Sequence, residues 1–222
     1  DFQEIGGHDP IFAPQSKEDS DIFNRFHLNG IEFIQTWEGF VYHMTSRGSR
    51  FNPASGGAPG KDSMEWIGTT TKNTREFIRK WGHMIQHDQY MKPIVPPKYN
   101  VGIRVKNCRL QLLEALEPWC DRIYVDNDRM KYITMEQPKT SFDLNKRVQD
   151  DIYVEDRHHD DIYVEIDGNT FGNESFRHIQ YLSEILANDE QLETGTFGLG
   201  DIKVTVYNLQ TYEKELIVCK KH

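Results

Sequence analysis

The sequence predicts an α/β protein made of two parts, and three observations lead to this prediction. Apolar residues recur at helical spacing in some stretches and in short extended runs in others, a pattern typical of mixed helix and strand structure. Closely spaced prolines in residues 93–99 cannot continue a helix or a central strand, so they indicate a linker. The 222 residues suffice for two small domains with separate cores. We therefore expect domains at residues 1–92 and 100–222.

An amphipathic helix is expected near the start of the chain, over residues 17–29. Ser16 can cap its first turn, and Gly30 can adopt the left-handed conformation beyond its last turn. Downstream we expect two short extended segments, a turn-rich loop, and a second helix that stops before a glycine. These elements cover residues 31–35, 40–43, 46–68 and 71–81.

The region after the linker is expected to form a smaller α+β domain. Its predicted helices cover residues 110–119 and 173–188, and its predicted strands cover residues 101–107, 122–126, 202–207 and 213–218. The hexamer DDIYVE occurs at residues 150–155 and again at 160–165, which favours a local duplication or a hairpin of like strands over a repeat architecture. The acids around it, with His158 and His159, could bind a divalent cation, but a solvated turn is the more common explanation.

Composition excludes some classes of protein and partner. The net charge of -9 disfavours a nucleic-acid partner, because phosphates would be repelled. No run approaches the roughly 18 apolar residues of a membrane span, and no charged-then-apolar leader opens the chain, so we expect a cytoplasmic protein with no membrane span. The three cysteines lack the CxxC spacing of zinc or redox sites, which predicts reduced, structural thiols.

The acids Glu18, Asp19 and Asp21 fall in the first turn of the expected helix. The helix dipole and free backbone N–H groups stabilise such carboxylates by about 0.3–1 kcal/mol each, and many helices carry them for that reason alone. The same position also keeps a carboxylate charged and rigidly held at the rim of a cleft, as a general base requires. The neighbouring residues decide between these two explanations.

Those neighbours form the pattern GG-x-D-x-x-F-x-P, then E-D-x-D-x-x-x-R, then a glycine and an extended segment that ends in histidine. The pattern resembles the C-terminal half of the catalytic domain of GT-A fold glycosyltransferases, the large family of inverting enzymes that use nucleotide sugars. The resemblance covers about residues 1–82, and the Glu-Asp helix is its most specific element. The matching residues are Gly6, Gly7, Asp9, Phe12, Pro14, Glu18, Asp19, Asp21, Arg25, Gly30 and His43.

The resemblance implies an incomplete, Rossmann-like GT-A half-domain that transfers a sugar from a nucleoside diphosphate sugar to an acceptor hydroxyl with inversion. It implies that Asp19 is the general base and that Glu18 contacts the acceptor or orients the base. It also implies that His43 helps to hold Mn²⁺ or Mg²⁺ on the leaving diphosphate, although a histidine that closes a strand is more often structural. The QxxRW signature of polymerising members is absent, which argues for transfer of single sugars in glycan biosynthesis.

The resemblance also implies a substrate-binding surface. The resemblance places Gly7, Asp9, Asp21 and Arg25 on this surface. The basic, glycine-rich loop that carries Arg47 and Arg50 could fold over the diphosphate and neutralise its developing charge. The same composition is equally consistent with a disordered surface segment.

The donor half of the family's fold, with its DxD metal site, does not precede the first residue. We therefore expect this chain to be inactive as an isolated fragment and to act as part of a longer polypeptide. The alternative, from another class, is a non-catalytic binding or assembly module built on a truncated glycosyltransferase fold.

The second region offers two weaker signals of sugar or nucleotide binding. Asp126 and Asp128 spell DxD after a predicted strand, a faint likeness to the opening of another GT-A domain, but a turn after a strand is the more common explanation. Trp119, Tyr124 and Tyr132 could form an aromatic sugar platform, although buried packing is the more common role of such side chains.

Overall fold

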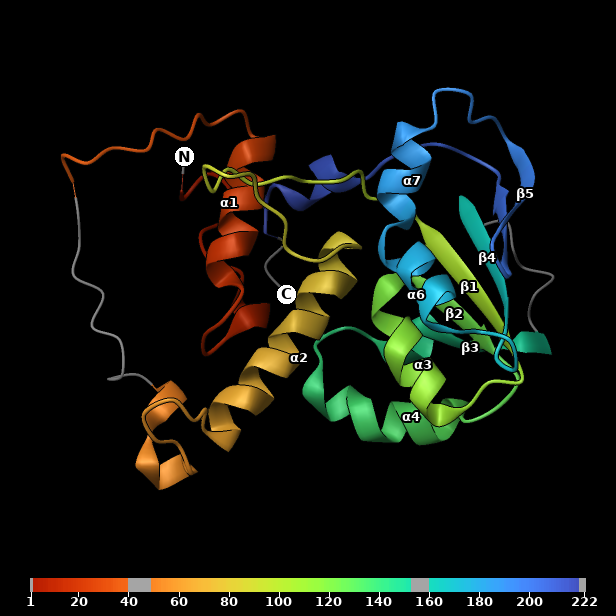
Figure 1. The fold of residues 1–222 in the computed structure, drawn as a ribbon, viewed down its shortest axis with the longest axis horizontal. Coiled ribbons are helices and arrows are strands. Elements are labelled where there is room, and N and C mark those ends of the chain that lie inside the picture. Colours follow the sequence, from red (N-terminus) through yellow and green to blue (C-terminus); the bar gives the residue numbers. More distant parts are fainter. Residues whose placement is uncertain (1, 40–48, 153–159, 220–222) are drawn as a thin grey trace. The chain divides into compact units, whose positions relative to one another are not determined.

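The structure is a computed structural model that describes residues 2–39, 49–152 and 160–219 (Figure 1). Its helices and mixed sheet confirm the α/β class. The chain forms two compact units, each made of segments that are not continuous in sequence. Unit 1 comprises Asp1–Arg75, Ile85–Ile94 and Ile217–His222, and unit 2 comprises Glu76–Met84 and Val95–Leu216. This division differs from the expected one, because residues 76–84 join the second unit and the C-terminal segment joins the first.

In unit 1 the expected first helix is present as α1, Glu18–Leu28. Its C-terminal end follows the expectation: Gly30 has φ +76°, and Ile31 N–H donates to Phe26 O at 3.0 Å. The expected Ser16 cap is wrong. Lys17 occupies the cap position with φ +79° and no side-chain cap bond, and Ser16 itself is in the left-handed region.

The second helix is longer than the sequence indicated. Helix α2 covers Met64–Trp81, and Ser63 begins it by accepting a hydrogen bond from Trp66 N–H at 3.1 Å. The short 3₁₀ segments η1, η2 and η3 cover Pro10–Phe12, Ser49–Phe51 and Pro53–Ser55. Residues 31–35 are not assigned to a strand, contrary to expectation, and the segment 40–43 lies outside the described residues.

Unit 2 is built on a six-stranded sheet in the order β3-β2-β1-β4-β6-β5. The first four of these strands are parallel, and β6 runs antiparallel to both of its neighbours. The strands are β1 Val101–Lys106, β2 Arg122–Val125, β3 Val148–Asp150, β4 Ile162–Asp167, β5 Gly195–Leu199 and β6 Ile202–Val206. The parallel core makes this an α/β unit and corrects the expected α+β class.

The helices of unit 2 pack on one face of this sheet. In Figure 1 the labelled helices α3, α6 and α7 lie on the same side of the strands. Side chains alternate along β1, so that Val101, Ile103 and Val105 enter the core while Arg104 lies on the opposite, polar face. The helices are α3 Leu110–Leu116, α4 Arg129–Glu136, α5 Leu144–Arg147, α6 Asn173–Gln180 and α7 Leu182–Asn188, and the 3₁₀ segments η4, η5 and η7 cover Glu117–Trp119, Gln137–Lys139 and Glu213–Leu216.

Several expected elements of unit 2 are corrected by the structure. The helix expected over residues 173–188 is broken at Tyr181 into α6 and α7. The strand expected over residues 213–218 is the 3₁₀ segment η7, and strand β5 lies upstream of it in a glycine-rich stretch that gave no strand signal. The second copy of the DDIYVE hexamer forms β4.

The described part of the first hexamer does not form a hairpin with the second copy. Its first residue, Asp150, ends β3, which pairs with β2 at the sheet edge and is separated from β4 by β2 and β1. The rest of the first copy from residue 153, with His158 and His159, lies outside the described residues. The aromatic residues Trp119, Tyr124 and Tyr132 are buried, which assigns them to packing rather than to a sugar platform.

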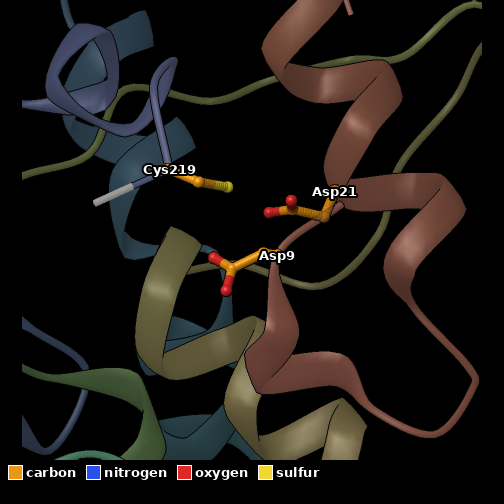
Figure 2. A group of neighbouring side chains, drawn as sticks. All are labelled: Asp9, Asp21 and Cys219. Atoms are coloured by element: carbon orange, nitrogen blue, oxygen red, sulfur yellow. The ribbon is translucent and has the colours of Figure 1, made fainter. Parts of the chain in front are cut away.

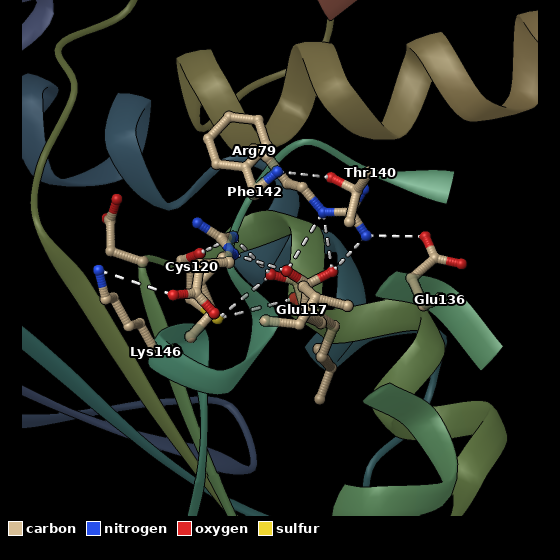
Figure 3. Close-up of polar contacts among 12 residues, drawn as sticks. Arg79, Glu117, Cys120, Glu136, Thr140, Phe142 and Lys146 are labelled. Carbon is tan, nitrogen blue, oxygen red and sulfur yellow. Dashed lines mark hydrogen bonds and ion pairs between the residues drawn. The ribbon is translucent and has the colours of Figure 1, made fainter. Parts of the chain in front are cut away.

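A buried network of charges holds the C-terminal third of α2 inside unit 2 (Figure 3). Arg79 donates to Glu117 at 2.7 Å and to Glu136 at 2.8 Å, and it pairs with Glu76 at 2.7 Å. Arg147 reaches the same Glu117 carboxylate at 2.7 Å. Burial by itself raises the pKa of Glu117, but Arg147 and Arg79 outweigh it and lower the pKa to about 2. This carboxylate therefore stays charged at the centre of the network.

The three thiols are expected to differ in reactivity. Burial, with a smaller effect of Asp126, raises the pKa of Cys108 to about 12, and burial raises the pKa of Cys120. Because the thiolate is the reactive form, a disulfide reagent at neutral pH should modify the half-buried Cys219 first and reach the other two only after denaturation. The Cys219→Ser variant should lose the fast reaction. Two fast thiols in the folded wild type would contradict the described burial.

No helix in the described part of the chain is long and apolar enough to cross a membrane.

Candidate functional site

A cavity of about 770 Å³ lies within unit 1, on one side of α1. Three stretches of chain line it: the first turns of α1, the segment after that helix, and the segment that returns to unit 1 after α2. The lining residues are 19, 20, 23 and 24, then 32–35, then 85–87 and 90–93. A concave site of this size, with a few polar groups on an apolar wall, has the form of a small-molecule site.

Helix α1 places Asp19 at the wall of this cavity. Asp19 is exposed and lies in the first turn, where the backbone N–H groups and the helix dipole favour a carboxylate. One turn later, Phe23 lines the same cavity and packs edge-on against Phe33, with ring centroids 5.5 Å apart and an interplanar angle of 79°. The Asp19 carboxylate is thus next to an aromatic surface.

Another part of the cavity lining is a short loop that Asp88 holds in shape. One oxygen of Asp88 accepts from the N–H groups of Tyr90 at 2.8 Å and Lys92 at 2.9 Å. The backbone of Asp88 donates to Lys92 O at 2.9 Å, and Met91 takes the left-handed conformation with φ +63°. This turn carries Tyr90 and Met91 to the cavity, where 61% and 65% of their surface stays exposed.

Asn24 is the buried polar residue of the cavity wall. It is 3% exposed, and its amide nitrogen has no hydrogen-bond partner among the described residues. A buried polar group without a partner costs about 1–3 kcal/mol. A residue that lines the cavity therefore carries a buried donor that is left unsatisfied in the described structure.

Arg25 and Asp21 do not face the cavity, which corrects their expected role as substrate contacts. Both side chains are fully buried, and Arg25 Nε donates to Asp21 at 2.9 Å. The remaining guanidinium nitrogens donate to Ile5 O at 2.8 Å and Gly7 O at 2.5 Å. Gly7 has φ +70°, so its role in the structure is to make the turn that Arg25 holds against α1. The arginine and the double glycine form one structural unit.

Asp9, Asp21 and Cys219 bring a carboxylate oxygen or sulfur atom within 4.8 Å of one another, and Figure 2 shows the three side chains pointing together. These residues do not fit Mn²⁺ or Mg²⁺, which prefer oxygen ligands, because one donor is a thiol. Asp21 is paired with Arg25, and Asp9 accepts from Ile11 N–H at 3.1 Å, as the cap of η1. The expected substrate contact of Asp9 is thus replaced by a capping role.

The other predicted site residues do not meet at the cavity. Glu18 is half-buried, with one carboxylate oxygen that has no hydrogen-bond partner in the described structure, and it does not line the cavity. Arg50 is exposed, pairs with Asp62 at 2.7 Å, and lies outside the cavity lining. His43 and Arg47 lie outside the described residues.

The DxD residues of unit 2 have structural positions. The two oxygens of Asp126 accept from the N–H groups of Asn107 at 2.6 Å and Cys108 at 2.9 Å. They fix the turn that joins β1 to α3. Asp128, in the left-handed conformation with φ +62°, is the residue that precedes α4. The explanation of this pair as a turn after a strand agrees with these contacts.

Sequence reasoning found one wall of the cavity and missed the other. Asp19 follows from the Glu-Asp pattern, whereas residues 85–92 carried no motif and Pro93 was interpreted only as the start of the expected linker at residues 93–99. The sequence shows Asn24 as a polar residue next to the apolar Ile22 and Phe23 on the expected helix. Its burial depends on packing that the sequence does not show. Glu32, a second exposed carboxylate at the cavity, carried no motif.

Comparison with protein-family models, curated proteins and solved structures finds no match for this chain.

Proposed function

We propose that the cavity in unit 1 is the acceptor side of an inverting glycosyltransferase site and that Asp19 is its general base. The observation that carries the proposal is the position of Asp19. The carboxylate that the glycosyltransferase resemblance selects is exposed on the wall of a cavity of about 770 Å³, at the start of a helix. Its neighbours in the motif, Asp21 and Arg25, hold the helix against the double-glycine turn and thus fix the position of the base.

The reaction needs one proton transfer and one displacement. Asp19 takes the proton from an acceptor hydroxyl while the oxygen attacks the anomeric carbon of a nucleoside diphosphate sugar. The bond from that carbon to the diphosphate breaks on the opposite side, so the configuration inverts. The proton then leaves Asp19 for water, which can reach this exposed carboxylate. General-base action of this kind contributes about 10²–10⁴-fold to a rate.

The proposal assigns no reaction step to a metal ion. The family resemblance implies Mn²⁺ or Mg²⁺ on the leaving diphosphate, but the described Asp9, Asp21 and Cys219 group does not fit such an ion for the reasons given above. The chemistry that this chain itself supplies is acceptor binding, orientation of the hydroxyl and proton removal.

A second candidate function is a non-catalytic binding module, and one observation favours it. Phe23, Ile34, Tyr90 and Met91 are exposed around the same cavity. Exposed apolar groups that cluster in this way mark binding surfaces in general, with or without catalysis. A binding module would hold the same ligands without turnover.

Measuring the release of nucleoside diphosphate distinguishes the two candidate functions. The longer polypeptide that is expected to contain this chain is incubated with uridine, guanosine, thymidine and cytidine diphosphate sugars. Each donor is tested with and without a pool of hexosides as acceptors. Glycosyl transfer predicts release with one donor that rises when acceptors are added. Binding of hexosides with no release from any donor would refute the enzymatic proposal and support the binding module.

A further inference from the structure

The cavity beside Asp19 is more apolar than recognition of a bare sugar requires. Its exposed side chains include Phe23, Ile34, Tyr90 and Met91, which are 45% to 80% exposed. A fully hydroxylated sugar would leave much of this surface in contact with water. An aromatic or aliphatic substituent would instead cover it, and the removal of this apolar surface from water would favour binding.

Asn24 adds a directional group to this apolar wall. Its buried amide nitrogen has no partner among the described residues, so the fold carries the cost of an unsatisfied donor. Because Asn24 lines the cavity, a rotation of its side chain would bring this nitrogen to an oxygen atom of a ligand. Asp19 and Asn24, five residues apart on α1, both line the cavity.

We infer that the cavity binds an acceptor glycoside with an aryl or alkyl aglycone, rather than a bare sugar. The reacting hydroxyl lies at Asp19, a ring or glycosidic oxygen accepts a hydrogen bond from Asn24, and the aglycone packs on Phe23 and Tyr90. The description of this ligand as an acceptor rests on the proposed function. The preference for an apolar aglycone and the role of Asn24 rest on the cavity itself.

Binding of matched glycosides to this 222-residue chain tests the inference without any turnover. The probes are phenyl hexosides and the corresponding methyl hexosides, in both anomeric forms, measured by calorimetry or ligand-observed NMR. The phenyl compound of at least one hexose should bind about tenfold or more tightly than its methyl counterpart. The variant Phe23→Ala should lose that difference.

Asn24→Leu separates a ligand contact from a structural role. Because the amide is unsatisfied, an apolar side chain of similar size should leave the thermal midpoint unchanged or higher. The same change should weaken binding of both phenyl and methyl hexosides by about five- to thirtyfold, through loss of the hydrogen bond. A structural asparagine would show the opposite pattern, with a lower midpoint and unchanged affinity.

Three results would overturn the inference: equal affinity for phenyl and methyl hexosides, no binding of either, or a lowered midpoint of Asn24→Leu with unchanged affinity. Loss of binding as the chain dimerises would also contradict it, because a second copy would then cover the apolar wall. Failure of this inference can be distinguished from failure of the proposed function. Glycoside binding without nucleoside diphosphate release refutes transfer alone, and transfer to bare sugars with no aglycone preference refutes this inference alone.

Discussion

Replacing Glu117 by glutamine is expected to lower the free energy of unfolding of unit 2 by about 3–5 kcal/mol. The Glu117 side chain is fully buried and receives Arg79 at 2.7 Å, Arg147 at 2.7 Å and the Tyr132 hydroxyl at 2.8 Å. Neutralising it leaves two buried guanidinium groups with less negative charge to compensate them. Urea unfolding followed by tryptophan fluorescence measures the change, and Glu190→Gln, on an exposed carboxylate, should alter it by less than about 0.5 kcal/mol.

The same carboxylate predicts an acid dependence of stability. The pKa of Glu117 is about 2 in the folded chain, below its usual 4.5, because Arg147 and Arg79 outweigh the effect of burial. Its contribution is therefore fully present above pH 4.5 and is lost as the pH falls towards 2, at most on the order of 3 kcal/mol. The wild type should lose stability steeply across this range, and Glu117→Gln should lose less. Parallel pH profiles for the two proteins would show that this carboxylate is not the titrating group.

Replacing Asp19 by asparagine is expected to reduce sugar transfer by about 10²–10⁴-fold in the natural polypeptide. The substitution is nearly isosteric and affects an exposed side chain, so the fold and glycoside affinity should change little. Rates of nucleoside diphosphate release at saturating acceptor measure the effect. Glu32→Gln is the matched control, because it removes the other carboxylate that lines the cavity.

The control also decides between the two carboxylates. A loss of less than about tenfold is expected for Glu32→Gln, since Glu32 lies after the helix and lacks its dipole. If Asp19→Asn retained wild-type turnover while Glu32→Gln lost it, the base would be Glu32. Equal activity in all three proteins would remove both from the mechanism.

Local signals predicted the elements that are stabilised by neighbours in sequence. Helix α1, the left-handed Gly30 after it, and strands β1 and β2 follow from periodicity and turn chemistry, and the structure contains them. Ser63 as the start of α2 was missed because the helix continues through Gly68 and three threonines, which are weak helix formers. The unit-2 sheet was placed in the wrong class because parallel pairing joins strands that lie far apart in sequence.

In the candidate site, too, the sequence did not reveal contacts between residues that are far apart along the chain. The spacing of Asp21 and Arg25 indicates an ion pair one helical turn apart. The remaining hydrogen bonds of that arginine go to the carbonyl groups of Ile5 and Gly7, which lie 20 and 18 residues away in the sequence, respectively. The motif therefore suggested that Arg25 contacts the substrate, whereas its hydrogen-bond partners are other residues of the protein. The cavity likewise needs residues 85–93, which only the three-dimensional structure brings back to α1.

The position of a bound acceptor relative to Asp19 tests the central claim most directly. A crystal structure of the chain with the tightest-binding phenyl hexoside would show it. The account predicts a sugar hydroxyl about 2.6–3.2 Å from an Asp19 carboxylate oxygen, with the phenyl ring against Phe23 and an oxygen near the Asn24 amide. A glycoside bound outside the cavity, or inside it with every hydroxyl nearer to Glu32 than to Asp19, would contradict the claim.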